Sequence, residues 1–506
     1  MLKGDNPVVR CVFSLEIQGL NEDNTRSKIP VRDKPVTEIK RERPQDYFVD
    51  WKEREELAER MIPLVGKLSR KNNITTYIYG QSLVSKSVLD IMQAHRVVRQ
   101  VEQNELSEYE TYPVIAALAD LDLGSAHIDA GRIAVNYEEQ GKPAGLSVED
   151  FVRSQVEDLI GQSNVGSEPR DVILYGFGRI GRLLARLLIE KSGPYADLRL
   201  RAIVVRGGKE GDLEKRASLL RRDSIHGPFN GSITIDTQRN AIKANGSYIQ
   251  VIYANSPSEV DYTAYGIENA LVVDNTGIWK DEAGLGQHLE SKGAAKVLLT
   301  APAKGNIKNI VYGVNNQDIK PEDKIVCAAS CTTNAITPTL KALNDKFGIN
   351  NGHVETVHSY TNDQNLIDNY HKAERRGRAA ALNMVITETG AAKAVSKALP
   401  ELEGKLTGNA IRVPKPNVSL AILNLTLNSS TSVEELNAFL RETALHSELR
   451  DQIDYTASTE IVSTDLVGSR YAGVVDSQAT IVEGNRVVLY VWYDNEFGYS
   501  CQVVRC

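Results

Sequence analysis

Asp171-Val172-Ile173-Leu174-Tyr175-Gly176-Phe177-Gly178-Arg179-Ile180-Gly181-Arg182 joins an apolar run to a turn rich in glycine. Leucines then recur at helical spacing over residues 183–188, so the pattern predicts a strand, a turn and a helix. Gly176 would make the tight turn, Gly178 would let the backbone approach a pyrophosphate, and Gly181 would allow close packing of the helix on the strand. Three glycines at this spacing are weak evidence alone. In this context they predict an α/β domain of the dinucleotide-binding type.

Further strands are expected downstream, at residues 198–205, 270–274 and 296–300. The first of them leads to Arg206, at the place where an NAD site carries an acidic residue for the ribose 2′-hydroxyl. A guanidinium can instead pair with a 2′-phosphate through two hydrogen bonds, so Arg206 favours NADP or the use of both nucleotides. The alternative is that Arg206 only faces solvent and the selectivity is relaxed.

A possible nucleophile lies in the segment 329–338, Ala-Ser-Cys-Thr-Thr-Asn-Ala-Ile-Thr-Pro. Cys331 follows a short apolar run and opens a segment of apolar periodicity, so it is expected where a strand passes into a helix. Unpaired N–H groups and the helix dipole at that place favour a thiolate and would lower the pKa of the thiol. Cys331 is therefore a candidate nucleophile, and a small buried hydrophobic side chain is the alternative.

A possible base follows in the segment 354–363, which alternates like a strand and ends in polar residues. This pattern places His358 at the tip of a strand, where functional side chains often gather. A single histidine is usually structural. With Cys331 at a helix start, however, the imidazole could form a thiolate–imidazolium pair and later move a proton.

Four longer motifs occur in order along the chain, at Ser330–Asn334, His358–Gln364, Thr389–Ala394 and Trp492–Ser500. Together they resemble phosphorylating glyceraldehyde-3-phosphate dehydrogenases, and the resemblance extends from about Asp171 to the end of the chain. It implies an α/β fold with a Rossmann-type dinucleotide-binding domain followed by an α+β catalytic domain. The implied bounds are 170–330 for the first domain, to which a segment at about 490–506 returns, and 331–489 for the second.

The resemblance implies a reaction in which the Cys331 thiolate attacks an aldehyde and His358 transfers the proton of the hemithioacetal oxygen. A hydride leaves for the nicotinamide, and inorganic phosphate releases 1,3-bisphosphoglycerate from the resulting thioester. The alternative for Arg412 is a charged side chain on the surface of a strand. The family pattern assigns Thr361 and Arg412 to the substrate phosphate, and Ser330, Thr332, Thr389 and Gly390 to the attacking phosphate.

The cofactor, NADP or NAD, would lie on the glycine turn and on the loops that follow the later strands. Asn369-Tyr370 departs from the apolar residue and proline that NAD-selective relatives carry, which again favours NADP or dual use. Asn495 matches the residue that orients the nicotinamide carboxamide. The cofactor-binding residues implied in this way are Gly176, Gly178, Arg179, Ile180, Gly181, Arg206, Thr276, Gly277, Thr300 and Asn495.

Two further departures concern the catalytic half. The family's phosphate loop reads Pro-Thr-Ser-Thr-Gly, whereas this chain has Ile386-Thr387-Glu388-Thr389-Gly390. A carboxylate beside an anion site is unfavourable unless it turns away or pairs with a cation, so Glu388 puts the phosphorylation step in question. The family's second cysteine, four residues after the nucleophile, is Ala335 here, and this loss does not affect the reaction described above.

The amino-terminal third lies outside the resemblance to ordinary family members. Residues 1–45 mix charges and prolines and are expected to form a flexible tail, with a targeting role left open. Residues 46–165 predict an all-α extension, similar to that of a longer, mostly bacterial branch of the family, and its role is open between regulation, oligomer contacts and partner docking. Pro63 should kink or restart the first helix. Helices are expected near 57–68, 88–98, 113–123 and 128–137 and after a capping box at 147–150, with His95 and His127 at structural positions.

Composition excludes several classes of protein. The 506 residues carry 59 basic and 66 acidic side chains, and a net charge of -7 provides no general attraction to nucleic acid or anionic membranes. The 5 cysteines have no metal-ligand spacing, and their odd number fits a reducing compartment, so we expect a cytoplasmic protein without a metal. No apolar run approaches the length of a membrane helix.

Three expectations about function remain open at this stage. The leading hypothesis is glyceraldehyde 3-phosphate as the sugar phosphate, and erythrose-4-phosphate dehydrogenase is the nearest rival because pocket length is not visible in a sequence. A regulatory protein that retains the fold is a rival of another class. A homotetramer is expected, because the loop after Asp368 resembles one that is completed across subunits.

Overall fold

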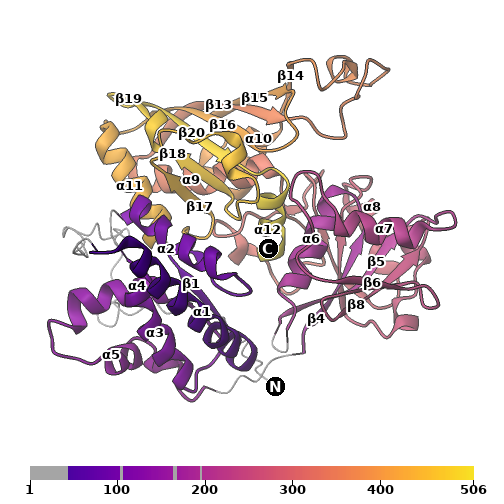
Figure 1. The fold of residues 1–506 in the computed structure, drawn as a ribbon. Coiled ribbons are helices and arrows are strands. Elements are labelled where there is room, and N and C mark those ends of the chain that lie inside the picture. The colour runs from indigo at the N-terminus through magenta and orange to yellow at the C-terminus, as the bar shows by residue number, and fades with distance from the viewer. Residues whose placement is uncertain (1–43, 103–105, 163–167, 194–195) are drawn as a thin grey trace. The chain divides into compact units, whose positions relative to one another are not determined.

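The computed structural model describes residues 44–102, 106–162, 168–193 and 196–506 (Figure 1). Nearly all of the expected tail over residues 1–45 therefore lies outside the described residues. The chain divides into an N-terminal unit, residues 1–167 with 193–196, and a C-terminal unit, residues 168–192 with 197–506. Among the described residues, no helix is both long enough and apolar enough to span a membrane.

The N-terminal unit is mainly helical and has its own apolar core, in which Met61, Leu68, Ile115 and Leu118 are almost completely buried. Three strands among its described residues form one small sheet in the order β2-β1-β3. The helices are α1 (Tyr47–Asn72), α2 (Val88–Glu102), α3 (Glu108–Asp120), α4 (Ala130–Asn136) and α5 (Val148–Gln155), and the strands are β1 (Ile74–Ile78), β2 (Gln81–Ser82) and β3 (Ala126–Asp129).

This sheet corrects the expectation that the extension is all-α. β1 is only five residues long, and its alternation of buried and half-buried side chains is too short to stand out beside the helical patterns. His127 lies in β3 and is exposed, whereas His95 is buried as expected. α1 continues through Pro63 instead of restarting there, with buried Met61 and Val65 on either side of the proline.

The first sheet of the C-terminal unit has nine strands in the order β11-β12-β10-β9-β4-β5-β8-β7-β6. Its pairings are parallel except for the antiparallel β6-β7-β8 edge. The strands are β4 (Arg170–Tyr175), β5 (Leu198–Val205), β6 (Ile233–Asp236), β7 (Ala241–Ala244), β8 (Ser247–Tyr253), β9 (Ala270–Asp274), β10 (Ala294–Leu299), β11 (Lys308–Asn309) and β12 (Ile325–Cys327), with α6 (Arg179–Glu190), α7 (Asp212–Arg221) and α8 (Glu282–Gly286).

β4 lies between β5, which follows it in the chain, and β9, which comes much later. The strand order therefore reverses at β4, and the glycine turn follows its carboxyl end. In open α/β sheets this switch point is where ligands bind, so the doubly wound fold expected from the sequence is present and presents its site here.

The second sheet of this unit has the order β14-β15-β13-β16-β20-β18-β17, with β19 paired to β20. Its apolar core includes Ile336 and Leu340 of the helix that follows β12, whereas Tyr499 and Val503 pack in the core of the first sheet. The remaining elements are α9 (Cys331–Phe347), β13 (Ile349–Ser359), β14 (Val385–Glu388), α10 (Ala391–Ala398), β15 (Leu406–Val413), β16 (Ser419–Leu427), α11 (Val433–His446), β17 (Ile453–Thr456), β18 (Gly473–Asp476), β19 (Ile481–Glu483), β20 (Arg486–Tyr493) and α12 (Phe497–Arg505).

Candidate active site

Cys331 is the first residue of α9, four residues after β12 ends at Cys327. Ser330 caps this helix, because its side-chain oxygen accepts a hydrogen bond of 3.1 Å from the N–H of Thr333. The N–H of Cys331 itself belongs to the first turn, where no intrahelical acceptor exists. The thiol therefore stands beside free backbone donors at the junction of a strand and a helix, as the sequence predicted.

His358 lies one residue before the end of β13 and is 6 % exposed. Its Nε2 is 3.5 Å from Sγ of Cys331, within the range of a hydrogen bond to sulfur. The two residues come from different elements, the start of helix α9 and the end of strand β13. This contact places a nucleophile and a base side by side.

Arg412 reaches the far side of the same imidazole. β13 and β15 are parallel neighbours, and their register places His358 opposite Arg412, so both side chains are on one face of the sheet. Nη1 of Arg412 is 2.9 Å from Nδ1 of His358 and 2.9 Å from the carbonyl oxygen of Ser359. Nδ1 is itself 2.7 Å from that carbonyl oxygen.

The charge state of the pair differs from the expectation. Burial raises the pKa of the Cys331 thiol, although the Arg412 charge and a hydrogen bond with Thr332 act in the opposite direction. Burial and then the charge of Arg412 lower the pKa of His358 to about 3. Since Cys331 keeps partial solvent access, water relieves part of this penalty. The free site thus favours a neutral thiol and a neutral imidazole, because desolvation outweighs the helix start.

Tyr493 contacts the residues around the reacting pair. Its role was not recognised in the sequence, although it lies within the Trp492–Ser500 motif. Its hydroxyl is 2.9 Å from the hydroxyl of Thr332 and 2.7 Å from that of Thr356. Its ring meets the His358 ring edge to face, with centroids 6.0 Å apart. The Thr332 hydroxyl, expected to bind the attacking phosphate, is therefore engaged with Tyr493.

The other residues expected to bind phosphate lie just after strands or at helix starts. Thr361 follows the end of β13 and is half-buried. The Thr389 hydroxyl accepts a hydrogen bond of 3.2 Å from the N–H of Ala391, and Gly390 is the exposed N-cap position of α10. Ser330 is half-buried, and its hydroxyl is 2.7 Å from that of Thr333.

Glu388 turns away from Arg412. β14 pairs with β15 so that Val385 lies opposite Arg412 and Glu388 lies opposite Asn409. Side chains alternate between the faces of a strand, which puts Val385 on the Arg412 face and exposed Glu388 on the other. The unfavourable carboxylate noted in the sequence is therefore directed to the opposite face of the sheet.

Two of the three glycines in the turn after β4 have a structural reason, and the third leaves open space. Gly176 has a φ of +96°, and a Cβ there would lie 3.1 Å from the Thr276 side chain. A Cβ on Gly181 would collide with the carbonyl oxygen of Gly176, whereas one on Gly178 would meet nothing within 4 Å. The backbone is thus packed tightly on both sides and open at Gly178, which suits a bound pyrophosphate.

The loops after β9 and β10 meet beside this turn. The N–H and hydroxyl of Thr276 donate to Asp274 at 2.8 Å and 2.7 Å, and Gly277 follows with a φ of +66°. The hydroxyl of Thr300 donates to the Asp274 carbonyl at 3.0 Å, so both expected loops are fixed to the end of β9. Arg206 is exposed directly after β5, and no hydrogen bond or ion pair within the described residues engages its guanidinium.

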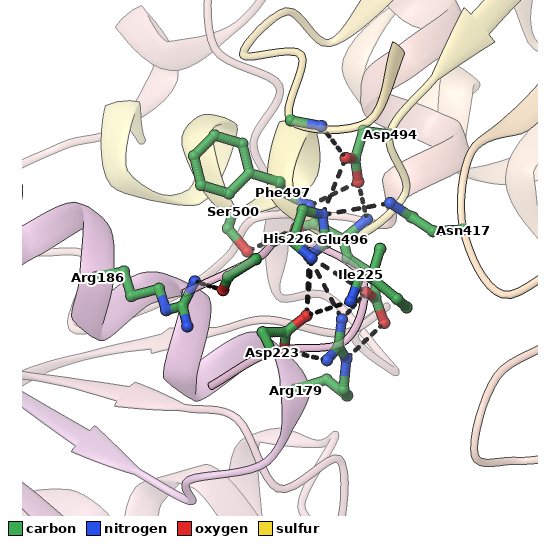
Figure 2. Close-up of polar contacts among 12 residues, drawn as sticks. Arg179, Arg186, Asp223, Ile225, His226, Asn417, Asp494, Glu496, Phe497 and Ser500 are labelled. Atoms are coloured by element: carbon green, nitrogen blue, oxygen red, sulfur yellow. Dashed lines mark hydrogen bonds and ion pairs between the residues drawn. The ribbon is translucent and has the colours of Figure 1, made fainter. Parts of the chain in front are cut away.

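Arg179, which the family pattern assigns with Ile180 to the pyrophosphate cradle, has its side chain engaged within the protein. Figure 2 shows its guanidinium between Asp223 and Glu496, with both of which it forms ion pairs. His226 lies beside them, and its Nε2 is 3.1 Å from Asp494. Only the backbone N–H groups of Arg179 and Ile180, at the start of α6, remain for a pyrophosphate.

This charged cluster surrounds the segment that carries Asn495. Asp494 and Glu496, on either side of Asn495, are held by His226 and Arg179, and the Ser419 hydroxyl donates to Oδ1 of Asn495 at 2.9 Å. The glycine turn and Asn495 are thereby connected through side chains. Sequence reasoning missed this cluster, although Asp494 and Glu496 lie within a motif that it quoted.

In the described part of the chain, no group of three or more potential ligands is arranged to hold a metal ion.

Two family models match the C-terminal unit. The model for the NAD binding domain of glyceraldehyde 3-phosphate dehydrogenase matches residues 170–282, and that for the C-terminal domain of the same enzyme matches residues 330–495. Neither match includes any of residues 1–167.

Curated relatives agree with these matches. A glyceraldehyde-3-phosphate dehydrogenase-like protein of Pseudomonas aeruginosa (strain UCBPP-PA14) is 62 % identical over 448 residues, which are 88 % of this chain and 97 % of that protein. Glyceraldehyde-3-phosphate dehydrogenase of Zymomonas mobilis is 41 % identical over 335 residues, 66 % of this chain and 96 % of that enzyme. The chloroplastic enzyme GAPA1 of Arabidopsis thaliana is 41 % identical over 334 residues, 66 % of this chain and 81 % of that enzyme. Only the first of these alignments is long enough to include most of the N-terminal unit.

Proposed function

Because the chain belongs to the glyceraldehyde-3-phosphate dehydrogenase family, we propose that it oxidises glyceraldehyde 3-phosphate reversibly to 1,3-bisphosphoglycerate through a thioester on Cys331. The observation that supports this proposal most directly is the 3.5 Å contact between the Cys331 thiol and His358 at a helix start. The family is one of oxidoreductases with a nicotinamide dinucleotide domain. The phosphorylating chemistry is the part that we propose.

In this mechanism the Cys331 sulfur adds to the aldehyde carbon, and Nε2 of His358 takes up the thiol proton. The N–H of Cys331 in the first turn of α9 is placed to donate to the oxyanion. His358 returns this proton to the oxyanion, which gives the hemithioacetal hydroxyl, and takes it up again as the hydride leaves. The nicotinamide, when bound, accepts the hydride, and the buried setting of His358 excludes water from the thioester. An incoming phosphate oxygen finally releases the acyl group from Cys331.

The phosphate groups require cations and N–H donors, and the chain supplies both near the thiol. Arg412 touches His358 and presents a guanidinium for the substrate phosphate. Thr361 lies just beyond the end of β13, the strand that carries His358. Thr389 and Gly390 stand at the start of α10, where N–H groups are free to meet the attacking phosphate. The outward direction of Glu388 removes the main objection to this second site.

For the cofactor we propose NADP, or both nicotinamide nucleotides. The exposed guanidinium of Arg206 stands after β5, where a ribose 2′-phosphate would lie, and a cation attracts that group. Asn369 and Tyr370 lie on the loop between β13 and β14, and Tyr370 is 90 % exposed.

A homotetramer remains part of the proposal. The loop between β13 and β14 projects from the second sheet (Figure 1). Exposed apolar area of this kind marks an interaction surface, and a second copy of the chain would cover it. The exposed apolar side chains of the loop and of β14 are Leu366, Ile367, Tyr370, Leu382, Met384 and Ile386. Measurement of the mass in solution tests this part.

The experiment that tests the function is a reductive assay with 1,3-bisphosphoglycerate, comparing NADPH with NADH and the wild type with Cys331→Ser. We expect oxidation of the reduced nucleotide by the wild type and loss of turnover in the variant. Erythrose 4-phosphate, assayed in the oxidative direction, tests the four-carbon alternative. Absence of turnover with every sugar phosphate would contradict the proposal and favour a regulatory protein on the same fold.

A further inference from the structure

Asn495 lies on a short crossover between the two sheets of the C-terminal unit. β20 ends in the second sheet at Tyr493, and α12 begins at Phe497 and packs against α6 of the first sheet. Residues 494–496 therefore connect the two halves of the site. Oδ1 of Asn495 accepts a hydrogen bond of 2.9 Å from the Ser419 hydroxyl, whereas its Nδ2 has no acceptor within the described residues. The amide group is thus oriented, and its donor is left for a ligand.

The residue after Asn495 holds this crossover to the start of α6. Nε of Arg179, the first residue of α6, donates to Oε1 of Glu496 at 3.0 Å, and Nη2 donates to the other carboxylate oxygen. The guanidinium thus meets the carboxylate with two parallel N–H groups, an arrangement that fixes direction as well as distance. The side chains of Arg179 and Glu496 are 24 % and 15 % exposed, so solvent and salt screen the pair less than they screen a surface pair.

A second carboxylate keeps Arg179 in this position. Nη1 of Arg179 pairs with Asp223, and Asp223 also accepts hydrogen bonds of 3.0 Å and 2.9 Å from two N–H groups of the turn that follows it. Burial acts in the opposite direction, but these N–H groups and the Arg179 charge lower the pKa of Asp223 to about 2, so it is ionised at neutral pH. In the same turn, Nε2 of His226 is 3.1 Å from Asp494 (Figure 2). The crossover is therefore held on both sides of Asn495.

The backbone of Arg179 belongs to a different part of the site. Its N–H group is at the first position of α6, where it has no intrahelical acceptor and is free to meet a pyrophosphate. The same residue thus presents its N–H to one end of a dinucleotide, while its side chain fixes the segment that carries the amide of Asn495 for the other end.

We propose that Glu496 is a positioning residue for the cofactor, whose ion pair with Arg179 sets the place of the Asn495 amide relative to the N–H groups at the start of α6. This inference rests on the proposed function, because it takes Asn495 as the residue that holds the nicotinamide carboxamide. Without the ion pair, the N–H groups of α6 would stay in place, whereas Asn495 would no longer be held at a fixed position beside them. The alternative is an ion pair that only stabilises the packing of α6 on α12.

An ion pair at the other end of α6 provides a matched control. Both carboxylate oxygens of Glu190, the last residue of α6, accept from Nη2 of Arg470, at 2.7 Å and 2.8 Å. The Arg470 carbonyl oxygen accepts from Gln502 of α12, so this pair also joins α6 to a segment that contacts α12. It lies about 16 Å along the helix from Arg179, at 1.5 Å per residue. Its loss should loosen the same two helices without disturbing Asn495.

The test compares the binding of NAD with that of ADP-ribose, which has the pyrophosphate and lacks the nicotinamide. Isothermal titration calorimetry of the purified full-length protein measures both, and NADP with 2′-phospho-ADP-ribose forms the second pair of ligands. Glu496→Gln keeps the size of the side chain and removes its charge. We expect it to weaken the binding of the complete nucleotide about fivefold, the size expected for one hydrogen bond, and to leave the binding of the matching ADP-ribose unchanged. Glu190→Gln should change neither.

Asn495→Ala shows whether Glu496 acts through the amide. This variant should lose the preference for the complete nucleotide over ADP-ribose, and adding Glu496→Gln to it should cause no further loss. Should Glu496→Gln fold poorly, Arg179→Lys is the second variant. A lysine keeps the charge beside the pyrophosphate but cannot meet Glu496 with two parallel N–H groups, so the same selective loss is expected.

Four outcomes would overturn the proposal. An equal loss for both ligands in Glu496→Gln, or in Arg179→Lys, would show a structural role. Unchanged or tighter binding of both ligands would show that the carboxylate does not act through the nicotinamide end. An additive effect in the double variant would exclude Asn495 as the intermediary, and a wild type that binds ADP-ribose as tightly as the complete nucleotide would remove the premise.

These titrations need no turnover, so this inference and the proposed function can fail separately. An enzyme that reduces 1,3-bisphosphoglycerate, but whose Glu496→Gln variant shows no selective loss, would keep the proposed function and lose the positioning role. A selective loss in a protein that turns over no sugar phosphate would have the opposite meaning.

Discussion

Each unit of the protein buries a histidine, and the two sites differ in the side chains that contact the imidazole. In the N-terminal unit, Nδ1 of His95 is 2.8 Å from the Ile91 carbonyl oxygen and Nε2 is 2.7 Å from the Thr111 hydroxyl. Glu108 beside it pairs with Arg54 at 2.6 Å. In the C-terminal unit, His358 meets a thiol and a cation whose Nε has no partner. Both nitrogens of the His95 ring thus contact hydrogen-bonding oxygens, although Oε1 of Glu108 is, like Nε of Arg412, buried without a hydrogen-bond partner within the described residues.

The same contrast holds for two arginines. Arg54 donates to a carboxylate with no solvent exposure, so its charge belongs to the structure. Arg206 is exposed and engages no acceptor within the described residues, so its charge is available to a ligand. A buried polar group that makes all of its hydrogen bonds indicates a role in stability. A polar group that lacks a hydrogen-bond partner indicates a candidate functional site.

The largest expected effect is on catalysis. His358→Asn should lower kcat by about 10³-fold, because the variant loses the group that transfers the proton, while the melting temperature changes little. Steady-state assays and thermal unfolding monitored by circular dichroism provide the two readouts. A variant that kept its kcat but melted at a much lower temperature would place His358 with His95, as a structural residue, and would break the comparison.

The second effect is on stability. His95→Leu should lower the free energy of unfolding of the N-terminal unit by about 2–4 kcal/mol, because it leaves Glu108 and Thr111 buried without the imidazole. Urea unfolding of the full-length protein measures the change. Thr111→Val, which removes only one hydrogen-bonding hydroxyl, should cost less. We expect kcat per folded molecule to stay the same in both variants, and a loss of kcat comparable to that of His358→Asn would contradict the assignment.

Low pH should lower the stability of the protein through both buried histidines. Burial lowers the pKa of His95, against the attraction of Glu108, and burial with Arg412 lowers the pKa of His358 to about 3. The unfolded chain then binds more protons below pH ~6.5, so stability is present above that value and falls as the pH decreases, by up to ~1.4 kcal/mol per pH unit for each histidine. Urea unfolding at several pH values between 7 and 4 measures the slope, and His358→Asn should flatten it. An identical slope in the variant would show that His358 is not held neutral.

The smallest effect concerns cofactor choice. Arg206→Asp should shift the ratio of kcat/KM values about tenfold or more from NADP toward NAD, because a carboxylate repels the 2′-phosphate and accepts from the 2′-hydroxyl. The conservative control is Arg206→Lys, which retains the charge and should retain most of the preference. An unchanged ratio in Arg206→Asp would show that the exposed guanidinium has no ligand. Arg206 would then no longer contrast with Arg54.

The sequence allowed the fold of the C-terminal unit and the Cys331–His358 contact to be predicted, because both depend on local patterns. A strand, a glycine turn and a helix follow one another directly at 170–190, and a long specific motif surrounds each reacting residue. The small sheet of the N-terminal unit escaped notice, since β1 and β3 are too short for periodicity to distinguish them.

Properties that depend on tertiary contacts could not be predicted. The pKa direction of Cys331 depends on how deeply the thiol is buried, and helix position alone gave the opposite sign. The partners of Arg179 lie 44 and 317 residues away in the chain, so no local pattern showed that Asp223 and Glu496 would occupy its guanidinium. The direction of Glu388 required the pairing of β14 with β15. The family bounds of the domains and the roles of the phosphate-binding residues remain predictions.

The pairing of His358 with Arg412 across β13 and β15 has an evolutionary consequence. Successive side chains of a strand point to opposite faces, so an insertion or deletion of one residue in β15 before Arg412 would send the guanidinium to the other side of the sheet. Substitutions along these strands can accumulate gradually, whereas a single insertion or deletion would disrupt the site at once. We therefore expect homologous proteins to differ in the residues along β13 and β15 but to keep the number of residues in each strand.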